Sequence, residues 1–328
     1  MNSNHTIVIT GAAGFIGSCL TGFLGRKGMD RLILVDDFSR ADKSPNLEGK
    51  AAISRVDRER FFRWLEQENP RVDAFFHLGA RTDTTDPDFG IFERLNLEYS
   101  RKVWQWCAAH QVPLVYASSA ATYGNGDAGY EDREEDLPKL HPLNPYGSSK
   151  HQFDLWAVSQ TRSQAPPFWA GLKFFNVYGP NEYHKGRMAS VVFHAHRQIH
   201  ETGKVRLFRS HLPAYRDGEQ LRDFIYVEDV LETCFWLMDT RPTSGIYNLG
   251  TGKARTFNDL ASAVFSALHA EPRISYMDMP ADIRDNYQYF TEAKMEKLQE
   301  AGYHNAFTSL EQGVEQYVNG YLEWMKYY

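Results

Sequence analysis

Cysteine is scarce in this sequence, and basic charge is not in excess. The three cysteines, Cys19, Cys107 and Cys234, are an odd number and lie far apart, which favours neither a disulfide framework nor a structural zinc site. The 36 basic residues are outnumbered by 42 acidic ones, so the net charge is −6. No basic stripe follows the chain, and we therefore expect no nucleic-acid partner.

Long hydrophobic runs are also absent. The first residues, MNSNHTIVIT, lack the cationic start and apolar stretch of a secretory signal, and no later apolar run approaches the roughly 18 residues of a membrane span. The chain contains no internal repeat and no low-complexity segment. These absences predict a cytoplasmic protein in a reducing compartment, with no membrane partner.

Apolar residues, in contrast, are plentiful enough for a large core. Of the 328 residues, 42% are hydrophobic and 14% aromatic, as in folded globular proteins and unlike disordered or coiled-coil chains. Short, almost wholly apolar runs alternate with helical patterns, which is typical of buried parallel strands joined by helical crossovers. The predicted strands cover residues 7–9, 32–35, 74–78 and 113–117, and the clearest helical face carries Phe92, Leu95, Tyr99, Val103 and Trp106.

The order of these patterns predicts an α/β fold: a Rossmann-type doubly wound parallel sheet with a smaller, interleaved α/β substrate lobe. A chain of this length exceeds the usual size of a single hydrophobic core, so we expect two lobes. We expect residues 1–178 to form the dinucleotide-binding domain, with a later segment at about 222–250 returning to it. Residues 179–328 are expected to form most of the substrate lobe.

A glycine-rich segment between the first strand and the first helix predicts a phosphate-binding loop. Gly11, Gly14 and Gly17 allow a sharp turn, close approach of the backbone to a pyrophosphate, and close packing of helix on strand. After the predicted strand at 74–78, the segment Leu78–Ala80, which includes Gly79, suits a similar close approach. An ordinary turn without a ligand is the alternative interpretation of both segments.

The end of the second predicted strand leaves the phosphate state of the dinucleotide open. Asp36 and Asp37 follow the glycines by about twenty residues, where a carboxylate accepts hydrogen bonds from the adenosine ribose and favours NAD. Arg40 and Lys43 follow, and either can pair with the 2′-phosphate of NADP. Asp57, after the next apolar run, either accepts from the adenine amino group or is a solvated loop residue.

A Tyr-x-x-x-Lys pair supplies the candidate catalytic groups. Asn144 suits a helix N-cap and Pro145 the first helical position, so we expect Tyr146 and Lys150 on one face of a new helix. A tyrosine with an ordinary pKa of about 10 is no base at neutral pH. The lysine ammonium and an oxidised nicotinamide would both favour its phenolate.

The end of the predicted strand at 113–117 completes a recognisable combination. Ser118 or Ser119 would hydrogen-bond the reacting oxygen of the substrate. The glycine loop, this serine-bearing strand end and the Tyr/Lys pair together resemble the extended short-chain dehydrogenase/reductase superfamily, from one end of the chain to the other.

Further segments resemble one branch of that superfamily, the ADP-glyceromanno-heptose 6-epimerases. HKGRMAS at 184–190 is the most discriminating, because UDP-galactose 4-epimerases and dTDP-glucose dehydratases share the glycine loop and the Tyr/Lys pair but lack this segment. The others are YASSAATYG at 116–124, FNVYGP at 175–180, RDFIYV at 222–227, NLGTG at 248–252 and YQYFT at 287–291.

The resemblance implies inversion at C6 of the heptose in ADP-D-glycero-D-manno-heptose, a step that supplies lipopolysaccharide core heptose. It also implies tightly bound NADP, with NAD as the alternative, an ADP-heptose substrate, and a homo-oligomer that is often a pentamer. Tyr146 would be one acid/base, Lys185 a second, and Lys150 would hold the nicotinamide ribose.

Resemblance and pattern together give the predicted site. The cofactor-binding residues would be Gly11, Gly14, Phe15, Ile16, Gly17, Asp36, Asp37, Arg40, Lys43, Asp57, Leu78, Gly79, Ala80, Arg81, Asn96, Lys150, Val177 and Lys185. The substrate-binding residues would be Asn176, Arg187, His194, Phe208, Arg209, Ser210, Arg222 and Tyr287.

The residues alone leave alternatives for individual positions. Lys185 is either the second acid/base or a solvated loop lysine. Arg222 either holds the diphosphate with its planar guanidinium or forms a salt bridge with a nearby aspartate, Asp223 or Asp229. His194 and the histidine at 196 are two apart, which on a helix points them away from each other, so we expect no metal site.

The main rival function is a 4,6-dehydratase or dehydrogenase of the same superfamily. Dehydratases usually carry an Asp-Glu pair where this chain has Ala120 and Ala121. A non-enzymatic NADP-sensing protein is the third possibility, and the intact Tyr146 and Lys150 argue against it.

Overall fold

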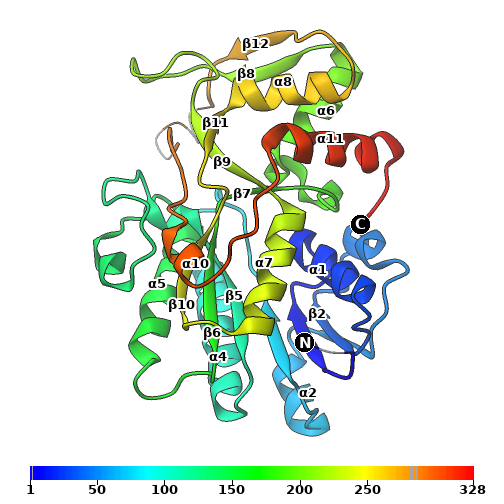
Figure 1. Ribbon diagram of the computed structural model, residues 1–328, viewed down its shortest axis with the longest axis vertical. Coiled ribbons are helices and arrows are strands. Elements are labelled where there is room, and N and C mark those ends of the chain that lie inside the picture. The colour runs from blue at the N-terminus through cyan, green and yellow to red at the C-terminus, as the bar shows by residue number, and fades with distance from the viewer. Residues whose placement is uncertain (2, 281–283, 285–286) are drawn as a thin grey trace.

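Seven parallel strands form the sheet at the centre of the larger lobe, the lower one in Figure 1, in the order β10-β6-β5-β4-β1-β2-β3. The computed structural model describes residues 1, 3–280, 284 and 287–328. The strands are β1 (Ile7–Thr10), β2 (Leu32–Asp36), β3 (Ser54–Asp57), β4 (Ala74–His77), β5 (Leu114–Ser119), β6 (Trp169–Phe174) and β10 (Gly245–Leu249). The predicted doubly wound parallel sheet is therefore confirmed.

Four strands of the large sheet are buried along their whole length. Every residue of β1, β2, β4 and β10 is buried, because flanking helices cover the sheet, and this explains why the runs are continuously apolar instead of alternating. The strands predicted from the four apolar runs correspond to β1, β2, β4 and β5. Parallel pairing places Thr10 beside both Val35 and His77, so the carboxyl ends of neighbouring strands meet at one edge.

Helices connect the strands of the large sheet. The Asn144 side chain accepts a hydrogen bond from the Gly147 N–H at 2.8 Å, and Pro145 is the first residue of α5, so the predicted helix start is confirmed. These helices are α1 (Phe15–Arg26), α2 (Phe61–Glu68), α3 (Phe89–Phe92), α4 (Tyr99–Ala109), α5 (Pro145–Gln160) and α7 (Val227–Thr240), with the shorter η1 (Ala41–Leu47), η3 (Ala120–Tyr123) and η4 (Glu134–Lys139). A further helix, α10 (Glu296–Glu300), comes after the last strand of this sheet and packs against β10.

One expected helix is not continuous. A π-helical stretch, η2 (Glu93–Glu98), separates α3 from α4. Phe92 and Val103 of the predicted face are fully buried, but the wider turn between them also turns Asn96 inward. A π turn adds a residue to the helix, and such turns are frequent at functional sites.

The smaller lobe lies above the large sheet in Figure 1 and contains two small sheets. One has the order β11-β9-β7 and the other pairs β12 with β8. Its elements are β7 (Asn176–Tyr178), η5 (Tyr183–Met188), α6 (Val191–Thr202), β8 (Val205–Phe208), β9 (Leu221–Tyr226), β11 (Ala254–Thr256), α8 (Phe257–Ala267), β12 (Ile274–Met277), α11 (Leu310–Gly320) and η6 (Leu322–Trp324).

The chain crosses between the lobes more than once. β9 belongs to a small sheet, whereas α7 packs on α1 and β10 is an edge strand of the large sheet. The domain boundary near residue 178 stays a prediction. Among the helices of the described ranges, none combines the length and the hydropathy that a membrane crossing needs.

Candidate active site

Two adjoining cavities run along the carboxyl edge of the large sheet. We call the first, of about 460 Å³, the glycine-loop cavity, because Gly11, Gly14 and Gly17 line it. We call the second, of about 430 Å³, the tyrosine cavity, because Tyr146 and Lys150 line it. The cavities share a wall formed by Phe15, Ile16, Leu78, Ala80, Thr82, Lys185 and Met188.

The glycine loop is packed too closely for side chains. Gly11 has a φ of +68°, and a Cβ there would lie 2.6 Å from the Gly79 Cα. A Cβ on Gly17 would lie 2.1 Å from the Gly11 carbonyl oxygen. α1 begins directly after the loop, at Phe15, so the N–H groups of its first turn and its dipole are directed toward the cavity. This geometry fits a pyrophosphate.

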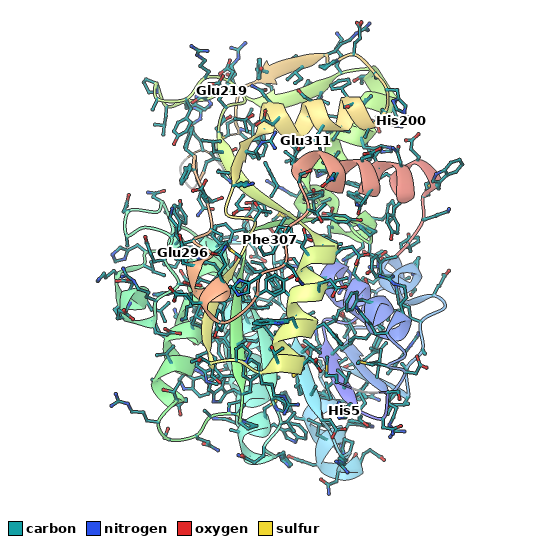
Figure 2. All side chains as sticks on the ribbon, viewed as in Figure 1. His5, His200, Glu219, Glu296, Phe307 and Glu311 are labelled. Atoms are coloured by element: carbon teal, nitrogen blue, oxygen red, sulfur yellow. The ribbon has the colours of Figure 1, made fainter. Side chains whose placement is uncertain are left out.

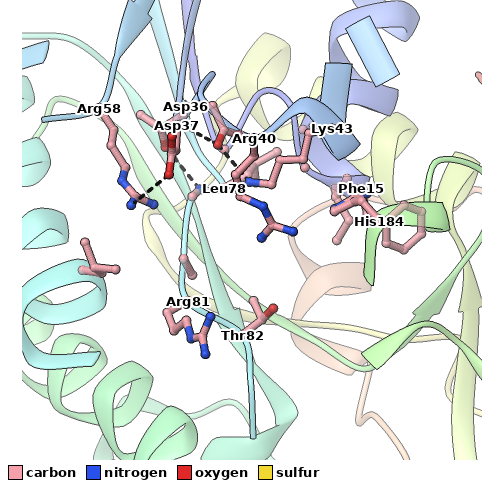
Figure 3. Close-up of a pocket in the computed structure, with 18 of the residues that line it drawn as sticks. Phe15, Asp36, Asp37, Arg40, Lys43, Arg58, Leu78, Arg81, Thr82 and His184 are labelled. Atoms are coloured by element: carbon pink, nitrogen blue, oxygen red, sulfur yellow. Dashed lines mark hydrogen bonds and ion pairs between the residues drawn. The ribbon is translucent and has the colours of Figure 1, made fainter. Parts of the chain in front are cut away.

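The carboxylate of Asp36, at the end of β2, is already bonded to other groups of the protein. It is buried and accepts hydrogen bonds from the Ala13 N–H at 2.9 Å and the Asp37 N–H at 2.7 Å. Lys43 Nζ lies 3.0 Å from its Oδ1 (Figure 3). Asp36 therefore fastens the glycine loop to the strand end, and Lys43 balances its charge.

Asp37 carries the more available carboxylate. Hydrogen bonds from Ser39, the nearer one from its hydroxyl at 2.5 Å, hold the pKa of Asp37 below its usual range. Arg58 Nη2 lies 3.4 Å from the other carboxylate oxygen of Asp37, Oδ2 (Figure 3). Arg40 pairs with the exposed Asp42 and also lines the cavity. This end of the glycine-loop cavity thus has several cations around its carboxylates.

A buried polar chain supports the wall at Leu78–Ala80. The His77 ring joins the Thr10 hydroxyl at 2.6 Å to the Ser100 hydroxyl at 2.8 Å. Burial lowers the pKa of His77 to about 3, so the ring is neutral and relays hydrogen bonds without charge. The Thr10 hydroxyl also accepts from the Gly79 N–H at 3.2 Å.

Asn96 belongs to this supporting layer and does not line either cavity. Its side-chain oxygen accepts from the Arg81 N–H at 2.8 Å, and its amide nitrogen donates to the Arg81 carbonyl and to Ser149, both at 3.0 Å. Direct contact with a cofactor was expected. The residue is instead buried behind the loop, and it fixes the backbone at Arg81, which does line the glycine-loop cavity.

Tyr146 and Lys150 lie on one face of α5, as the spacing predicts. Lys150 Nζ donates to the Ala117 carbonyl at 2.7 Å. Burial lowers the pKa of Lys150 to about 8, with Asp154 opposing the change. Burial raises the pKa of Tyr146, and a hydrogen bond with Ser119 partly offsets the rise. In the protein alone, burial therefore outweighs the hydrogen bond with Ser119 and favours the neutral phenol. The prediction that Lys150 and an oxidised nicotinamide together favour the phenolate stays a prediction.

Ser118 and Ser119 have different surroundings. Ser118 donates to the Asp154 carboxylate at 2.6 Å, and Tyr116 donates to its other oxygen at 3.1 Å. Lys173 completes this group with a fully buried ion pair to Asp154 at 2.9 Å. The Ser118 hydroxyl is therefore committed to a structural network, although the residue borders the tyrosine cavity. Ser119 is the serine next to the Tyr146 phenol.

Lys185 lies in the wall common to both cavities. Its ammonium is 5.2 Å from the centroid of the Phe15 ring, a distance compatible with a cation–π contact. Glu182, one turn earlier, is fully buried, and burial raises its pKa while Lys185 opposes the rise. The Glu182 carboxylate accepts from the Ser190 N–H at 2.6 Å and from its hydroxyl at 2.7 Å, which fixes the segment that carries the lysine.

Arg222 is a buried cation at the far side of the tyrosine cavity. Its guanidinium lies 5.0 Å from the Tyr287 ring and 5.7 Å from the Phe257 ring. Burial lowers the pKa of Arg222, and only tyrosines act against this. Within the described residues no carboxylate pairs with Arg222. Its polar partners there are the carbonyl oxygens of Leu221, at 2.9 Å, and Gln288.

The salt bridge proposed as the alternative for Arg222 is not formed. Asp223 accepts from the N–H groups of Thr251 and Gly252 at 2.7 and 2.9 Å. Asp229 accepts from Thr308. A buried guanidinium beside a cavity, with no carboxylate partner among the described residues, is suited to an anionic ligand.

Most of the other predicted residues line the expected cavity. Val177, Asn176 and Tyr287 border the tyrosine cavity, and the remaining glycine-loop residues border the other. Asp57 does not, because its carboxylate caps the following turn at the Glu59 N–H, 2.9 Å away. The structure also places the predicted substrate residues Arg187, His194, Phe208, Arg209 and Ser210 outside both cavities.

These five residues lie on segments that point away from the two cavities or lie beyond them. Arg187 is exposed after the bend at Gly186, and His194 lies on α6. Phe208 ends β8, in the sheet at the top of Figure 1. The two residues after it turn toward Asp217.

Some cavity residues were not predicted. Arg58 and Thr82 line the glycine-loop cavity, as do His184 and Met188. Arg58 could have been found, since it follows a predicted strand at the edge where strand ends converge. The HKGRMAS segment contained the signal for His184 and Met188. Phe257, which borders the tyrosine cavity, begins a helix far along the chain and gave no local signal.

Comparison with known proteins agrees with this architecture. Residues 7–250 match the NAD dependent epimerase/dehydratase family. The chain is similar to the ADP-L-glycero-D-manno-heptose-6-epimerase of Fusobacterium nucleatum, 44% identical over 326 residues, which is 96% of this chain and 98% of that one. The enzyme of the same name from Nitratidesulfovibrio vulgaris (strain DP4) is 47% identical over 317 residues, 96% and 97% of the two chains. The crystal structure of the Helicobacter pylori ADP-L-glycero-D-manno-heptose-6-epimerase superposes with a TM-score of 0.80 at 28% identity, covering 97% of this chain and 96% of that chain.

Proposed function

The chain belongs to the NAD dependent epimerase/dehydratase family, and from this premise we propose that it inverts C6 of the heptose in ADP-D-glycero-D-manno-heptose, giving the L-glycero epimer. It is an isomerase that uses a nicotinamide cofactor. The observation that carries the proposal is that Tyr146, Lys150 and Lys185 border one cavity whose wall is shared with the glycine-loop cavity. The reaction would supply heptose for the lipopolysaccharide core.

The residues present fit a dinucleotide. The loop at Gly11 and Gly17 has no room for a Cβ, and the first turn of α1 offers N–H donors to a pyrophosphate. Asp37 would accept from the adenosine ribose, and Lys150 would hold the nicotinamide ribose. When bound, the cofactor supplies a reversible hydride acceptor for C6.

Tyr146 handles the proton on the C6 hydroxyl. Ser119, hydrogen-bonded to Tyr146, positions the phenol and the substrate oxygen together. The raised pKa keeps Tyr146 protonated in the resting protein, so it begins as a donor unless positive charge is added beside it. Lys150 supplies part of that charge, and its pKa of about 8 leaves a substantial fraction protonated at neutral pH.

Inversion needs proton delivery at a second position. When bound, the cofactor would accept hydride from one face of C6 and return it to the other, so the C6 oxygen would need a proton-transfer group at each of two positions in the cavity. Lys185, in the common wall, serves the second position, while Glu182 and Ser190 hold its segment in place. Arg222 and Asn176 hold the diphosphate, with Tyr287 packed on the guanidinium.

We assign the cofactor as NADP. Asp36 is already satisfied by Lys43 and by backbone N–H groups. Arg40 and Arg58 flank the remaining carboxylate, which supports the binding of a 2′-phosphate. Denaturing the purified protein and identifying the released nucleotide by mass spectrometry tests this, and stoichiometric NAD would contradict it. A homo-oligomer, pentameric by resemblance, stays a prediction for sedimentation analysis.

The decisive experiment follows both C6 epimers of ADP-heptose by NMR. We expect interconversion without added nicotinamide, because the hydride returns to the carbon it left. A dehydrogenase would require external cofactor and accumulate an oxidised or reduced sugar, and a dehydratase would release water. Either result would reject the epimerase.

Tyr146→Phe tests the proton transfer directly. Removing the phenol oxygen is expected to lower turnover by a factor of about a hundred or more, with cofactor occupancy and far-UV circular dichroism unchanged. Tyr130→Phe, which removes a phenol that donates to the Phe290 carbonyl outside both cavities, is the matched control. Undiminished turnover in Tyr146→Phe would remove this residue from the mechanism.

A further inference from the structure

Three metal-ligating side chains meet outside the cleft, on α6 and η6. His196 and His200 are four residues apart on α6, so they lie on the same helical face. Glu323 of η6 meets them there: its Oε1 lies 2.6 Å from His196 Nε2 and 2.7 Å from His200 Nε2. Figure 2 shows His200 at the outer side of the smaller lobe. We propose that these residues form a binding site for one divalent transition-metal ion of the zinc class.

The ligand atoms are already close to a metal-binding arrangement. One ligand atom from each residue lies within 4.8 Å of the others. In tetrahedral zinc sites with bonds of about 2.0–2.2 Å, ligand atoms are about 3.3 Å apart. The carboxylate therefore needs to move back by only about half an ångström or slightly more, which rotation of the Glu323 side chain supplies.

The donor set selects the kind of ion. Two imidazole nitrogens and one carboxylate oxygen suit Zn²⁺ and its neighbours, whereas Mg²⁺ and Ca²⁺ prefer oxygen ligands only. Three protein ligands leave a fourth coordination position. His200 is about half exposed, so water can fill that position from the solvent.

The orientation of the two rings also suits a cation. Both Nε2 atoms face the Glu323 carboxylate, at 2.6 and 2.7 Å from its Oε1. When an ion binds, each ring needs its proton on Nδ1 so that Nε2 presents its lone pair.

The site would join two separated parts of the chain. Beyond Glu323, the Lys326 carbonyl accepts a hydrogen bond from the Tyr183 hydroxyl at 3.2 Å, and the Tyr183 and Tyr327 rings are 4.9 Å apart. Tyr183 begins η5, the segment that carries Lys185. An ion would therefore strengthen the attachment of the C-terminal segment to the outer side of the active-site wall.

The sequence contains the pair His196 and His200, but His196 was considered only together with His194. His194 and His196 point apart, as expected, and they gave the prediction of no metal site. His196 and His200 have the spacing that shares a face, and Glu323 is brought to them only by the fold.

The test uses untagged full-length protein, treated with a chelator and dialysed, and Zn²⁺ alone as the probe. Binding is measured by competition with a chromophoric chelator, and metal content by elemental analysis. We expect one Zn²⁺ per chain. His200→Ala and Glu323→Gln are each expected to weaken binding at least about tenfold. Two controls, His304→Ala and Glu315→Gln, remove an exposed histidine and an exposed carboxylate elsewhere and should bind like the wild type.

Two further readouts separate the site from general adsorption. Zn²⁺ should raise the melting temperature of the wild type and of both controls, but not that of His200→Ala, whose circular dichroism is expected to be unchanged. Co²⁺ in the site should show the visible absorption of a four-coordinate ion. Failure of the wild type to bind stoichiometrically at micromolar Zn²⁺, or equal affinity in His200→Ala, would overturn the proposal and leave a hydrogen-bonded cluster only. Neither result bears on the epimerase activity.

Discussion

The buried ion pair between Lys173 and Asp154 allows a sharp test of how α5, which carries Tyr146 and Lys150, is held in place. Lys173 and Asp154 are both fully buried, and Asp154 accepts from Ser118 and Tyr116, while Lys173 also donates to Thr122 at 2.6 Å. Removing one charge of such a pair leaves the other uncompensated, which costs about 3–5 kcal/mol. That is a large part of the roughly 5–15 kcal/mol by which proteins are stable.

Lys173→Met and Asp154→Asn should each lower the free energy of unfolding by about that amount. The double variant carries neither charge, and its asparagine still accepts from one hydroxyl. We expect it to be less destabilised than the sum of the single variants, and no more than the worse of them. Urea unfolding with equal m-values is the measurement. Additive losses would show that the two charges do not stabilise each other, and losses below about 1 kcal/mol in both single variants would refute the reasoning.

Three shorter predictions concern the cleft and its surroundings. Lys185→Met should abolish most epimerisation but leave the nicotinamide content unchanged, and full activity in the NMR assay would reject the two-base scheme. Gly17→Ala places a Cβ 2.1 Å from the Gly11 carbonyl, so we expect loss of bound nucleotide and about 1–3 kcal/mol of stability; Gly25→Ala, where a Cβ meets nothing within 4 Å, is the control in the same thermal melts. Burial raises the pKa of Asp132 to about 6, so the neutral carboxyl stabilises the folded protein. This contribution to the free energy of unfolding is present below about pH 4 and is lost as pH rises through about 6. Asp132→Asn should therefore be more stable than the wild type at about pH 7.5, by up to about 3 kcal/mol in urea unfolding, and an equal pH dependence would contradict this.

Local patterns were sufficient for four strands of the large sheet, β1, β2, β4 and β5, and for the start of α5. A continuous apolar run, an N-cap asparagine with a following proline, and glycines between strand and helix each report on neighbours in the sequence. These features predicted Tyr146 and Lys150 on one face and the glycine loop at the strand edge.

The hydrogen-bond and ion-pair partners of individual side chains lie far away in the sequence, so the sequence alone could not predict them. Ser118 and Ser119 are adjacent in the sequence, yet only the position of Asp154 on α5 decides which hydroxyl is engaged. Arg222 forms no ion pair with Asp223 because Asp223, once the chain has folded, accepts from the N–H groups of Thr251 and Gly252. The outward position of Phe208 depends on the pairing of β8 with β12, whose residues are about seventy apart in the sequence.

The π-helical stretch between α3 and α4 has an evolutionary consequence. The stretch Glu93–Glu98 holds one residue more than a regular α-helix would need. Because each residue of an α-helix accounts for about 100° of rotation, removing one residue would rotate the residues on one side of the deletion by about that angle relative to the other side. Deleting a single residue from 93–98 would restore ideal geometry and raise local helical regularity, yet it would turn the Asn96 carboxamide away from Arg81. Natural variants that shorten this stretch should therefore be rare among active enzymes, even where a shortened helix folds well.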